Sequence, residues 1–363
     1  MTSYLSIYLL SCFNSYLFHK DLKFKNAFFY IFFSYIFFFC AFRFNVGGDW
    51  KRYLLVYNYD LYHFEDFFFK KESFYHIISY VTHYLTNNIF FNHFIFSAIF
   101  FLSILPFLIS RRNPALCLSI LLPFGIFILH MGFIRQSLAL SFIILSIFLY
   151  EKKYFYYSFI FIILSIGFHL SAIIFLPVIL FHFLNFKIRY LHLLYLILIT
   201  NLLVFFFITI RLVFNIDLNF EYINVFSNQF QTLKLIQSYI VDNESISLGL
   251  FYRIIPTILS FFLFMFYFRN KDINYWLLFF CLLILFIFVC LSLGFYTLAD
   301  RLNYYTLPFQ LIIFSLWIKK FSNNLFNELY FYFLLILNLS LLLIWLLFSN
   351  YSKMNWQYYL TIF

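Results

Sequence analysis

Charge is what this sequence has least of. Only 10% of its 363 residues are charged and 65% are hydrophobic, whereas a soluble domain carries about a quarter charged residues. A soluble fold cannot bury so much apolar surface, because its surface area grows too fast relative to the volume of its core. The shortage of charge therefore excludes a soluble globular protein and predicts that lipid surrounds much of the exterior.

Glycine, proline and cysteine are scarce as well. The 7 glycines and 6 prolines form no linker that would divide the chain. The 5 cysteines lie inside apolar runs and form no CxxC pair, so we expect small buried hydrophobic residues and no disulfide framework. The sequence also lacks an Asp-x-Asp motif or a cluster of metal ligands, which predicts no metal, no cofactor and metal-independent chemistry. The cysteines are Cys12, Cys40, Cys117, Cys281 and Cys290.

What the sequence has instead is a series of continuous apolar runs. A membrane-spanning helix needs about 20 mostly apolar residues, and the runs lack the alternation of a membrane β-barrel. We predict an all-α fold, a polytopic integral membrane helical bundle of about 11-12 transmembrane helices, as a single transmembrane domain over residues 1–363. The candidate spans are 3–18, 26–42, 88–110, 114–130, 133–150, 154–168, 170–186, 190–212, 248–268, 274–297, 302–318 and 326–348.

Two of these segments have more than one interpretation. Polar residues such as Asn14 dilute segment 3–18, which lacks the features of a removable signal and is expected to be the first span. Segment 154–168 is short, and together with 170–186 it would also fit one broken helix.

The positive charges follow the apolar runs in a regular pattern. Lys and Arg lie in short loops between the runs, which indicates membrane orientation and argues against a nucleic-acid partner. One alternating set of loops holds 13 of the 24 basic residues and carries a net charge of +9, while the rest of the chain carries +1. The basic residues of this set are Lys20, Lys23, Lys25, Arg111, Arg112, Lys152, Lys153, Lys187, Arg189, Arg269, Lys271, Lys319 and Lys320.

This split predicts the orientation of the chain. The positive-inside rule makes the basic loops cytoplasmic. Two longer polar loops, at about 43–87 and 213–247, then lie on the outer face together with both termini. If segment 3–18 does not span, only the N-terminus changes side.

Four polar clusters remain on the predicted outer face, and each has an ordinary structural explanation. Gly47 and Gly48 would turn the backbone at a helix end, with Asp49 as the N-cap of the next helix. Arg135 would snorkel to the membrane interface, and a loose carbonyl at a helix end would hold His169. Asp300 and Arg301 would neutralise each other. The clusters cover residues 43–53, 130–137, 167–172 and 297–305.

Taken together, the clusters also predict a binding site. They place Arg43, Arg135 and Arg301 on one face with a histidine and an acid. An arginine at a membrane boundary is a functional hypothesis by default, and its planar fork of donors suits phosphate oxygens. The pattern fits a lipid-linked phosphate or diphosphate.

In this order, the clusters resemble the EpsG-like branch of the Wzy-type bacterial polysaccharide polymerases. The resemblance runs from about residue 40 to 310, and the loop 213–247 matches no part of the pattern. The matching pieces are Arg43 with Gly47-Gly48-Asp49-Trp50-Lys51-Arg52-Tyr53, Glu72-Ser73-Phe74-Tyr75, Phe133-Ile134-Arg135-Gln136-Ser137-Leu138-Ala139, Phe168-His169-Leu170-Ser171-Ala172 with Pro177, and Asp300-Arg301 with Tyr304-Tyr305.

The resemblance implies an activity. Such polymerases build O-antigen, capsule or exopolysaccharide by joining oligosaccharide repeat units carried on undecaprenyl diphosphate. They act at the outer face of the bacterial inner membrane. The sugar chain moves to a hydroxyl of another unit, and the lipid diphosphate leaves as an anion that needs charge stabilisation. The implied partners are the lipid-linked oligosaccharide, membrane lipid and a chain-length regulator protein.

The resemblance also implies roles for individual residues. Arg135 and Arg301 would bind the diphosphate, with help from Arg43. The acceptor hydroxyl needs a base, for which we prefer His169 over Asp49, since an imidazole titrates at about 6.5. The candidates for sugar binding are Gln136, Trp50, Tyr53, Tyr304 and Asp300.

Three other classes of protein stay open. A flippase for the lipid-linked sugar would need polar groups near the bilayer midplane, whereas the charges here lie at one end of the helices. A membrane acyltransferase would use a histidine but would not need several arginines. An O-antigen-ligase-like enzyme shares the donor and differs in its acceptor, so the sequence does not separate it from a polymerase.

The charge split generates a prediction about topology. A reporter fused after Lys153 or Lys320 should report the cytoplasm, and one fused after Asp66 or Asn228 should report the outside, because the basic loops stay inside. Reporter activity in intact cells measures this. A cytoplasmic signal at Asp66 would contradict both the orientation and the idea that the four clusters share a face.

Overall fold

A computed structural model of the chain describes residues 2–59, 72–183, 248–267, 275–292, 295–318 and 324–356. In these segments the chain forms 15 α-helices, with one π-helical and one 3-10 stretch between them. Three helices are long and apolar enough to cross a membrane, and several shorter helices are apolar too. The prediction of an all-α, multi-pass membrane protein is confirmed.

The chain divides into two compact units, each with its own helices. The first unit comprises Met1–Ile179 and Leu311–Phe363, and the second comprises Leu180–Gln310, so the divisions fall inside α9 and α16. The prediction of a single transmembrane domain stays a prediction. The helices that begin in the first part of the chain are α1 (Thr2–His19), α2 (Lys25–Ala41), α3 (Trp50–Tyr59), α4 (Ser73–Thr86), α5 (Ile89–Ile109), α6 (Pro114–Leu121), η2 (Leu122–His130), α7 (Ile134–Glu151), α8 (Phe155–Phe168), η3 (Leu170–Phe175) and α9 (Leu176–Phe183). Those that follow are α13 (Leu248–Tyr267), α14 (Tyr275–Ser292), α15 (Tyr296–Tyr304), α16 (Leu307–Trp317), α17 (Asn324–Phe348) and α18 (Asn350–Asn355).

The outer surface of the first unit is apolar. Ile31 of α2 is 69% exposed and Ile336 of α17 is 64% exposed, although both are large hydrophobic side chains. Water would penalise such exposure, whereas the hydrocarbon of a bilayer does not. These faces therefore fit contact with lipid.

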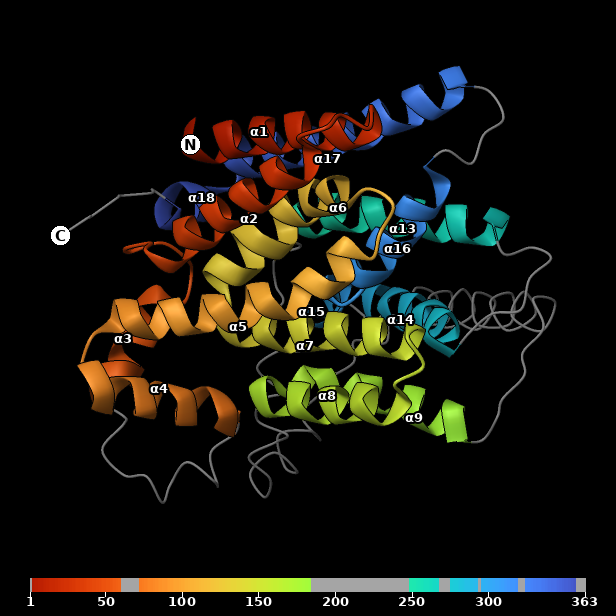
Figure 1. Ribbon diagram of the computed structural model, residues 1–363. Helices are drawn as coiled ribbons and strands as arrows, with labels where there is room; N and C mark the ends of the chain where they lie inside the picture. The colour runs from red at the N-terminus through yellow and green to blue at the C-terminus, as the bar shows by residue number, and fades with distance from the viewer. Residues whose placement is uncertain are drawn as a thin grey trace, which may run out of the picture. The chain divides into compact units, whose positions relative to one another are not determined.

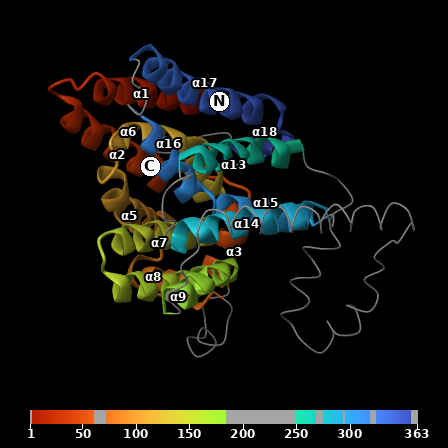
Figure 2. The same cartoon turned by 90° about the vertical axis from the view of Figure 1, so that its right-hand side faces the viewer.

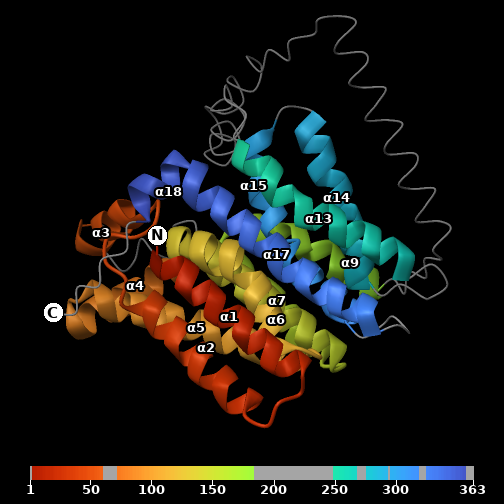
Figure 3. The same ribbon diagram turned by 90° about the horizontal axis from the view of Figure 1, so that it is seen from above.

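Small polar residues let the helices of the first unit pack closely. α1 lies between α2 and α6 (Figure 3), and α17 packs on α1 and α6 (Figure 2). At the α1–α6 contact, Ser15 Oγ and Ser119 Oγ are 2.7 Å apart, and Ser119 Oγ donates to the carbonyl of Ser11 at 3.1 Å. Serines allow close approach of two backbones and hydrogen-bond across it, which is a common way for helices to associate in lipid.

Four further helices surround the region that matters most below. α5, α7 and α8 lie side by side (Figure 1), and α4 contacts both α5 and α8. α6 continues into the π-helical η2 at Leu122, next to Pro123, which lacks the N–H that an α-helical turn would use. Residues 131–133 then connect η2 to α7, as predicted for a very short connection.

The polar stretch 43–87, predicted as a longer loop, contains two short helices, α3 and α4. Neither contains an apolar run long enough to have been predicted as a span. α4 is held by one face, where Tyr75, Ser79 and Thr82 are buried at helical spacing. The second predicted loop, 213–247, and the predicted span 190–212 lie outside the described residues.

The boundaries of two predicted spans also differ in the structure. The run 274–297 is not one helix, since α14 ends at Ser292 and α15 begins at Tyr296. The run 302–318 is divided between α15 and α16, because Pro308 is tolerated only in the first turn of a helix. The segments 154–168 and 170–186, which would also have fitted one broken helix, are separate helical segments. His169 has an extended backbone between α8 and η3.

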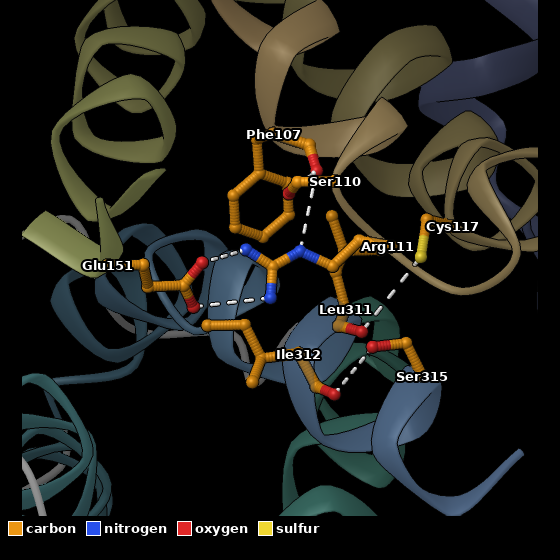
Figure 4. Close-up of polar contacts among 8 residues, drawn as sticks. All are labelled: Phe107, Ser110, Arg111, Cys117, Glu151, Leu311, Ile312 and Ser315. Atoms are coloured by element: carbon orange, nitrogen blue, oxygen red, sulfur yellow. Dashed lines mark hydrogen bonds and ion pairs between the residues drawn. The ribbon is translucent and has the colours of Figure 1, made fainter. Parts of the chain in front are cut away.

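Two ion pairs of the first unit involve residues from the predicted cytoplasmic loops. Arg111 Nη1 donates to Glu151 Oε1 at 3.2 Å, and Arg111 also lies 4.1 Å from the centre of the Phe107 ring (Figure 4). Lys20 pairs with Glu328 at 2.6 Å. All of these charged residues belong to the predicted cytoplasmic loops or the helix ends beside them. The predicted assignment of these loops to the cytoplasm stays a prediction.

At the opposite end, a glycine turn leads into α3. Gly47 has a φ of +112°, and a Cβ atom there would lie 2.1 Å from the carbonyl oxygen of Met131. Hydrogen bonds on either side fix the turn, from Gly47 N to Asn355 O at 2.8 Å and from Asp49 N to Gly132 O at 3.4 Å. The sequence requires glycine here for both reasons.

We therefore predict that Gly47→Ala destabilises the protein. The left-handed backbone and the clash with Met131 together should cost about 2 kcal/mol or more. Thermal unfolding of the purified protein in detergent measures the loss. Gly48→Ala is the matched control, because Gly48 is partly exposed and has no positive φ. Equal stability of the two variants would contradict this account of the turn.

Candidate functional site

A charged pair at the start of α7 is the centre of the candidate site. Arg135 Nη1 pairs with Glu72 Oε2, and their side chains are only 20% and 11% exposed. Glu72 precedes α4 with a φ of +63° and makes no side-chain hydrogen bond to cap the helix. A left-handed backbone at a non-glycine residue costs about 1 kcal/mol or more. The strained residue, Glu72, is the one whose carboxylate pairs with Arg135.

Two tyrosine rings border the guanidinium group. The Arg135 Cζ atom lies 6.0 Å from the centre of the Tyr53 ring and 5.9 Å from that of Tyr75. Burial raises the pKa of Tyr53 to about 12, so its hydroxyl keeps its proton near neutral pH. That hydroxyl donates to Asp49 Oδ2 at 3.4 Å. Asp49 is thereby linked to the same group of side chains.

His169 completes the group from the end of α8. Its Nε2 atom lies 3.5 Å from Glu72 Oε1. Its Nδ1 atom accepts the N–H of Ser171 at 3.3 Å and lies 2.6 Å from Ser171 Oγ. Because Nδ1 accepts a hydrogen bond, we assign the proton of the neutral ring to Nε2, which faces the carboxylate of Glu72.

The first unit thus brings four of the predicted site residues together, namely Asp49, Tyr53, Arg135 and His169. The residue that connects them is Glu72, to which the sequence analysis gave no role. Glu72 belongs to the family resemblance, but nothing else in the sequence pointed to it. Helix α4, which begins at Ser73, had been predicted as part of a loop. Amphipathic spacing in 73–86 could have identified the helix.

Three other predicted residues of this unit lie deeper. Arg43 is 1% exposed, and its guanidinium donates to the carbonyls of Cys40 at 2.8 Å and His130 at 3.5 Å. Trp50 is buried and stacks on His93 with the ring centres 4.8 Å apart. Gln136 is buried as well. Their predicted roles in ligand binding stay predictions. In this conformation, the Arg43 guanidinium donates to backbone carbonyls at the ends of α2 and η2.

The second unit holds a charged pair of its own. Arg253 of α13 donates twice to Asp300 of α15, from Nε to Oδ1 and from Nη2 to Oδ2, both at 2.7 Å. Its Cζ atom also lies 5.7 Å from the centre of the Tyr304 ring. Such a bidentate pair fixes geometry as well as charge. Arg253 was not among the predicted site residues, although a single arginine inside the apolar run 248–268 is a signal of a functional position.

This pair gives Asp300 a partner that was not predicted, and the predicted role of Arg301 stays a prediction. Asp300, expected to pair with Arg301 or to bind sugar, accepts two hydrogen bonds from Arg253. Arg301 is partly exposed in α15. The predicted joint binding of one diphosphate by Arg135 and Arg301 involves residues of both units and stays a prediction.

Beneath the second pair lies a buried network of neutral polar side chains. Thr257 Oγ1 donates to Asn303 Oδ1 at 2.6 Å, and Asn303 Nδ2 donates to the carbonyl of Arg253 at 2.9 Å. Gln310 Nε2 lies 3.0 Å from Thr257 Oγ1 and 2.9 Å from Thr306 Oγ1. The network joins α13, α15 and α16 within an apolar environment, where hydrogen bonds between helices stabilise association.

The described residues contain no group of three His, Cys, Asp or Glu side chains that could hold a metal ion. The candidate site therefore consists of charged, aromatic and imidazole groups. Metal independence stays a prediction.

The fold and the site define a multi-pass α-helical membrane protein whose charged residues form pairs at the helix ends. The chain belongs to the EpsG family, whose model matches residues 26–361. This confirms the resemblance found in the sequence, and the family is linked to exopolysaccharide biosynthesis. No curated protein and no solved structure is detectably similar to the chain.

The site predicts that the identity of the cation at position 135 matters. Arg135→Lys keeps the charge but loses the fork of donors, so polymer formation should fall roughly 10- to 100-fold, the worth of one charge-assisted hydrogen bond. The amount of long-chain surface polysaccharide, with protein level checked by immunoblot, measures this.

Arg111→Lys is the matched control, because Arg111 also pairs with a glutamate, Glu151, at the other end of α7 (Figure 4). It should leave polymer formation within a few-fold of the parent protein. A near-normal amount of polymer from Arg135→Lys would indicate that Arg135 only anchors the helix at the membrane interface.

Proposed function

We propose that this protein is a polysaccharide polymerase that joins undecaprenyl-diphosphate-linked oligosaccharide repeat units at the outer face of the bacterial inner membrane. The observation that carries the proposal is the part-buried Arg135, held by Glu72 and bordered by two tyrosine rings beside His169. Membership of a family linked to exopolysaccharide biosynthesis supports it.

The leaving group explains why an arginine is needed. In the transfer, the bond between the sugar C1 atom and the diphosphate oxygen breaks, and the diphosphate keeps the electron pair. An anion of this kind is stabilised by donors that are already in position, and the guanidinium fork matches its oxygens. Arg135 would supply this fork from the first unit.

The acceptor explains the remaining groups. A sugar hydroxyl must lose its proton as the new glycosidic bond forms, which requires a base. The pair formed by His169 and Glu72 supplies this base, and Asp49, next to Tyr53, is the alternative. Tyrosine rings such as Tyr53 and Tyr304 offer faces on which sugars can stack.

A flippase for the same lipid-linked unit is the second candidate. The buried network of Thr257, Asn303, Thr306 and Gln310 favours it, because transporters place polar groups inside the helical bundle. However, the network is neutral and its donors bond to neighbouring helices, whereas the charged groups lie at helix ends. A ligase would use the same donor chemistry and transfer the sugar chain to a different acceptor.

Deletion of the gene separates these functions. We predict that cells without it lose long-chain surface polysaccharide and accumulate single repeat units on the lipid carrier at the outer face. Gel sizing of the polysaccharide, together with extraction of lipid-linked sugars from spheroplasts treated with a glycosidase, measures both. Complementation with the parent gene, but not with Arg135→Lys, should restore the polymer.

The other functions give different results in this experiment. Single units confined to the inner leaflet would indicate a flippase. Long polymer that remains on the lipid carrier would indicate a ligase. Either result would contradict the polymerase proposal.

A further inference from the structure

Glu72 holds both groups that the proposed reaction needs. One carboxylate oxygen pairs with Arg135, the proposed diphosphate ligand. The other lies 3.5 Å from His169 Nε2, the predicted catalytic imidazole. A residue in this position connects binding of the donor to transfer of a proton.

A diphosphate would compete with Glu72 for Arg135. A carboxylate and a phosphate use the guanidinium donors in the same planar, two-pronged way. The donor's diphosphate carries more negative charge than one carboxylate, so it is the stronger partner for the same cation. Binding of the donor to Arg135 would therefore displace Glu72.

The displaced carboxylate becomes a better proton acceptor. The Glu72 side chain is only 11% exposed, and loss of the nearby Arg135 charge raises the affinity of such a shielded carboxylate for a proton. Uptake of a proton removes the charge. The nearest proton that the reaction supplies is the one that the acceptor hydroxyl must lose.

His169 is arranged to orient the carboxylate. Its Nε2–H faces Glu72 Oε1, and its Nδ1 atom accepts the N–H of Ser171. To act as the base itself, the imidazole would have to give up the Ser171 bond at the start of η3. For Glu72, binding of the donor to Arg135 itself removes the competing ion pair.

We propose that the donor diphosphate displaces Glu72 from Arg135 and that the released carboxylate, oriented by His169, takes the proton of the acceptor hydroxyl. This inference rests on the proposed polymerase function. The acceptor oxygen forms its bond to the sugar C1 atom as its proton passes to Glu72. The C1–O bond to the diphosphate breaks, and Arg135 holds the departing anion. Glu72 is thus the catalytic base, and His169 is a positioning residue.

The test separates binding from turnover in Glu72→Gln. Purified protein in detergent is titrated with undecaprenyl diphosphate, and polymerisation is measured with lipid-linked repeat units extracted from the deletion strain. Without the competing carboxylate, Glu72→Gln should bind undecaprenyl diphosphate at least as tightly as the parent protein. Turnover should fall roughly 10²- to 10⁴-fold, because glutamine cannot accept the proton.

Glu151→Gln is the matched control, since it removes the carboxylate of the Arg111 pair at the other end of α7. It should change neither quantity more than a few-fold. If Glu72→Gln does not fold, Glu72→Gly replaces it, because glycine adopts the left-handed backbone of this position without strain. The same pattern of retained binding and lost turnover is expected.

Two results would overturn the inference. If Glu72→Gln weakens binding and turnover together, the carboxylate only supports Arg135. If turnover stays within a few-fold of the parent protein, Glu72 is not the base. Failure of the parent protein to polymerise the same units would instead contradict the proposed function, so the two failures are distinguishable.

His169→Gln identifies which member of the pair takes the proton. Glutamine keeps an N–H donor for Glu72, so a positioning role predicts a loss of turnover smaller than that of Glu72→Gln. His169→Asn, which also keeps an N–H donor, should likewise retain part of the turnover. A loss of roughly 10²- to 10⁴-fold from His169→Gln, with Glu72→Gln nearly active, would assign the base to the imidazole.

Discussion

The ion pair between Arg135 and Glu72 is the interaction on which the rest of the candidate site depends. It joins the first turn of α7 to the residue before α4, and it is mostly shielded from solvent. Removing one partner of such a pair leaves an uncompensated charge, which typically costs about 3–5 kcal/mol. The strained backbone of Glu72 and the position of His169 at the end of α8 are arranged around this pair.

The same helix shows how a structural pair differs from a functional one. Arg135 lies in the first turn of α7 and Glu151 is its last residue, so the two are 16 residues and roughly 24 Å apart along the helix. At the far end, Arg111 pairs with Glu151 and covers the ring of Phe107 (Figure 4), with no titratable imidazole among the residues drawn there. At the near end, the pair adds His169, Tyr53 and Asp49. Charge alone therefore does not define the site, and the neighbouring acid–base groups do.

Much of the fold could be predicted from the sequence, because lipid imposes long apolar runs and sorts basic loops to one side. The elements that escaped prediction are those that neither rule covers. α4 buries one face while its length stays below that of a span, and the run 302–318 is divided where α15 ends at Tyr304 and α16 begins at Leu307.

The site was predicted less completely than the fold. Arg135, His169, Asp49 and Tyr53 were chosen from the types of residue and from the family resemblance, and the structure places them in one group. Their connection through Glu72, like the pairing of Arg253 with Asp300, depends on contacts between residues far apart in the chain. No local spacing contains that information.

The most direct test of the central claim is an experimental structure of the protein with undecaprenyl diphosphate bound. The account predicts phosphate oxygens within hydrogen-bond distance of Arg135, with the Glu72 carboxylate moved away from the guanidinium and still next to His169. An intact Arg135–Glu72 pair, with the diphosphate bound elsewhere, would contradict it.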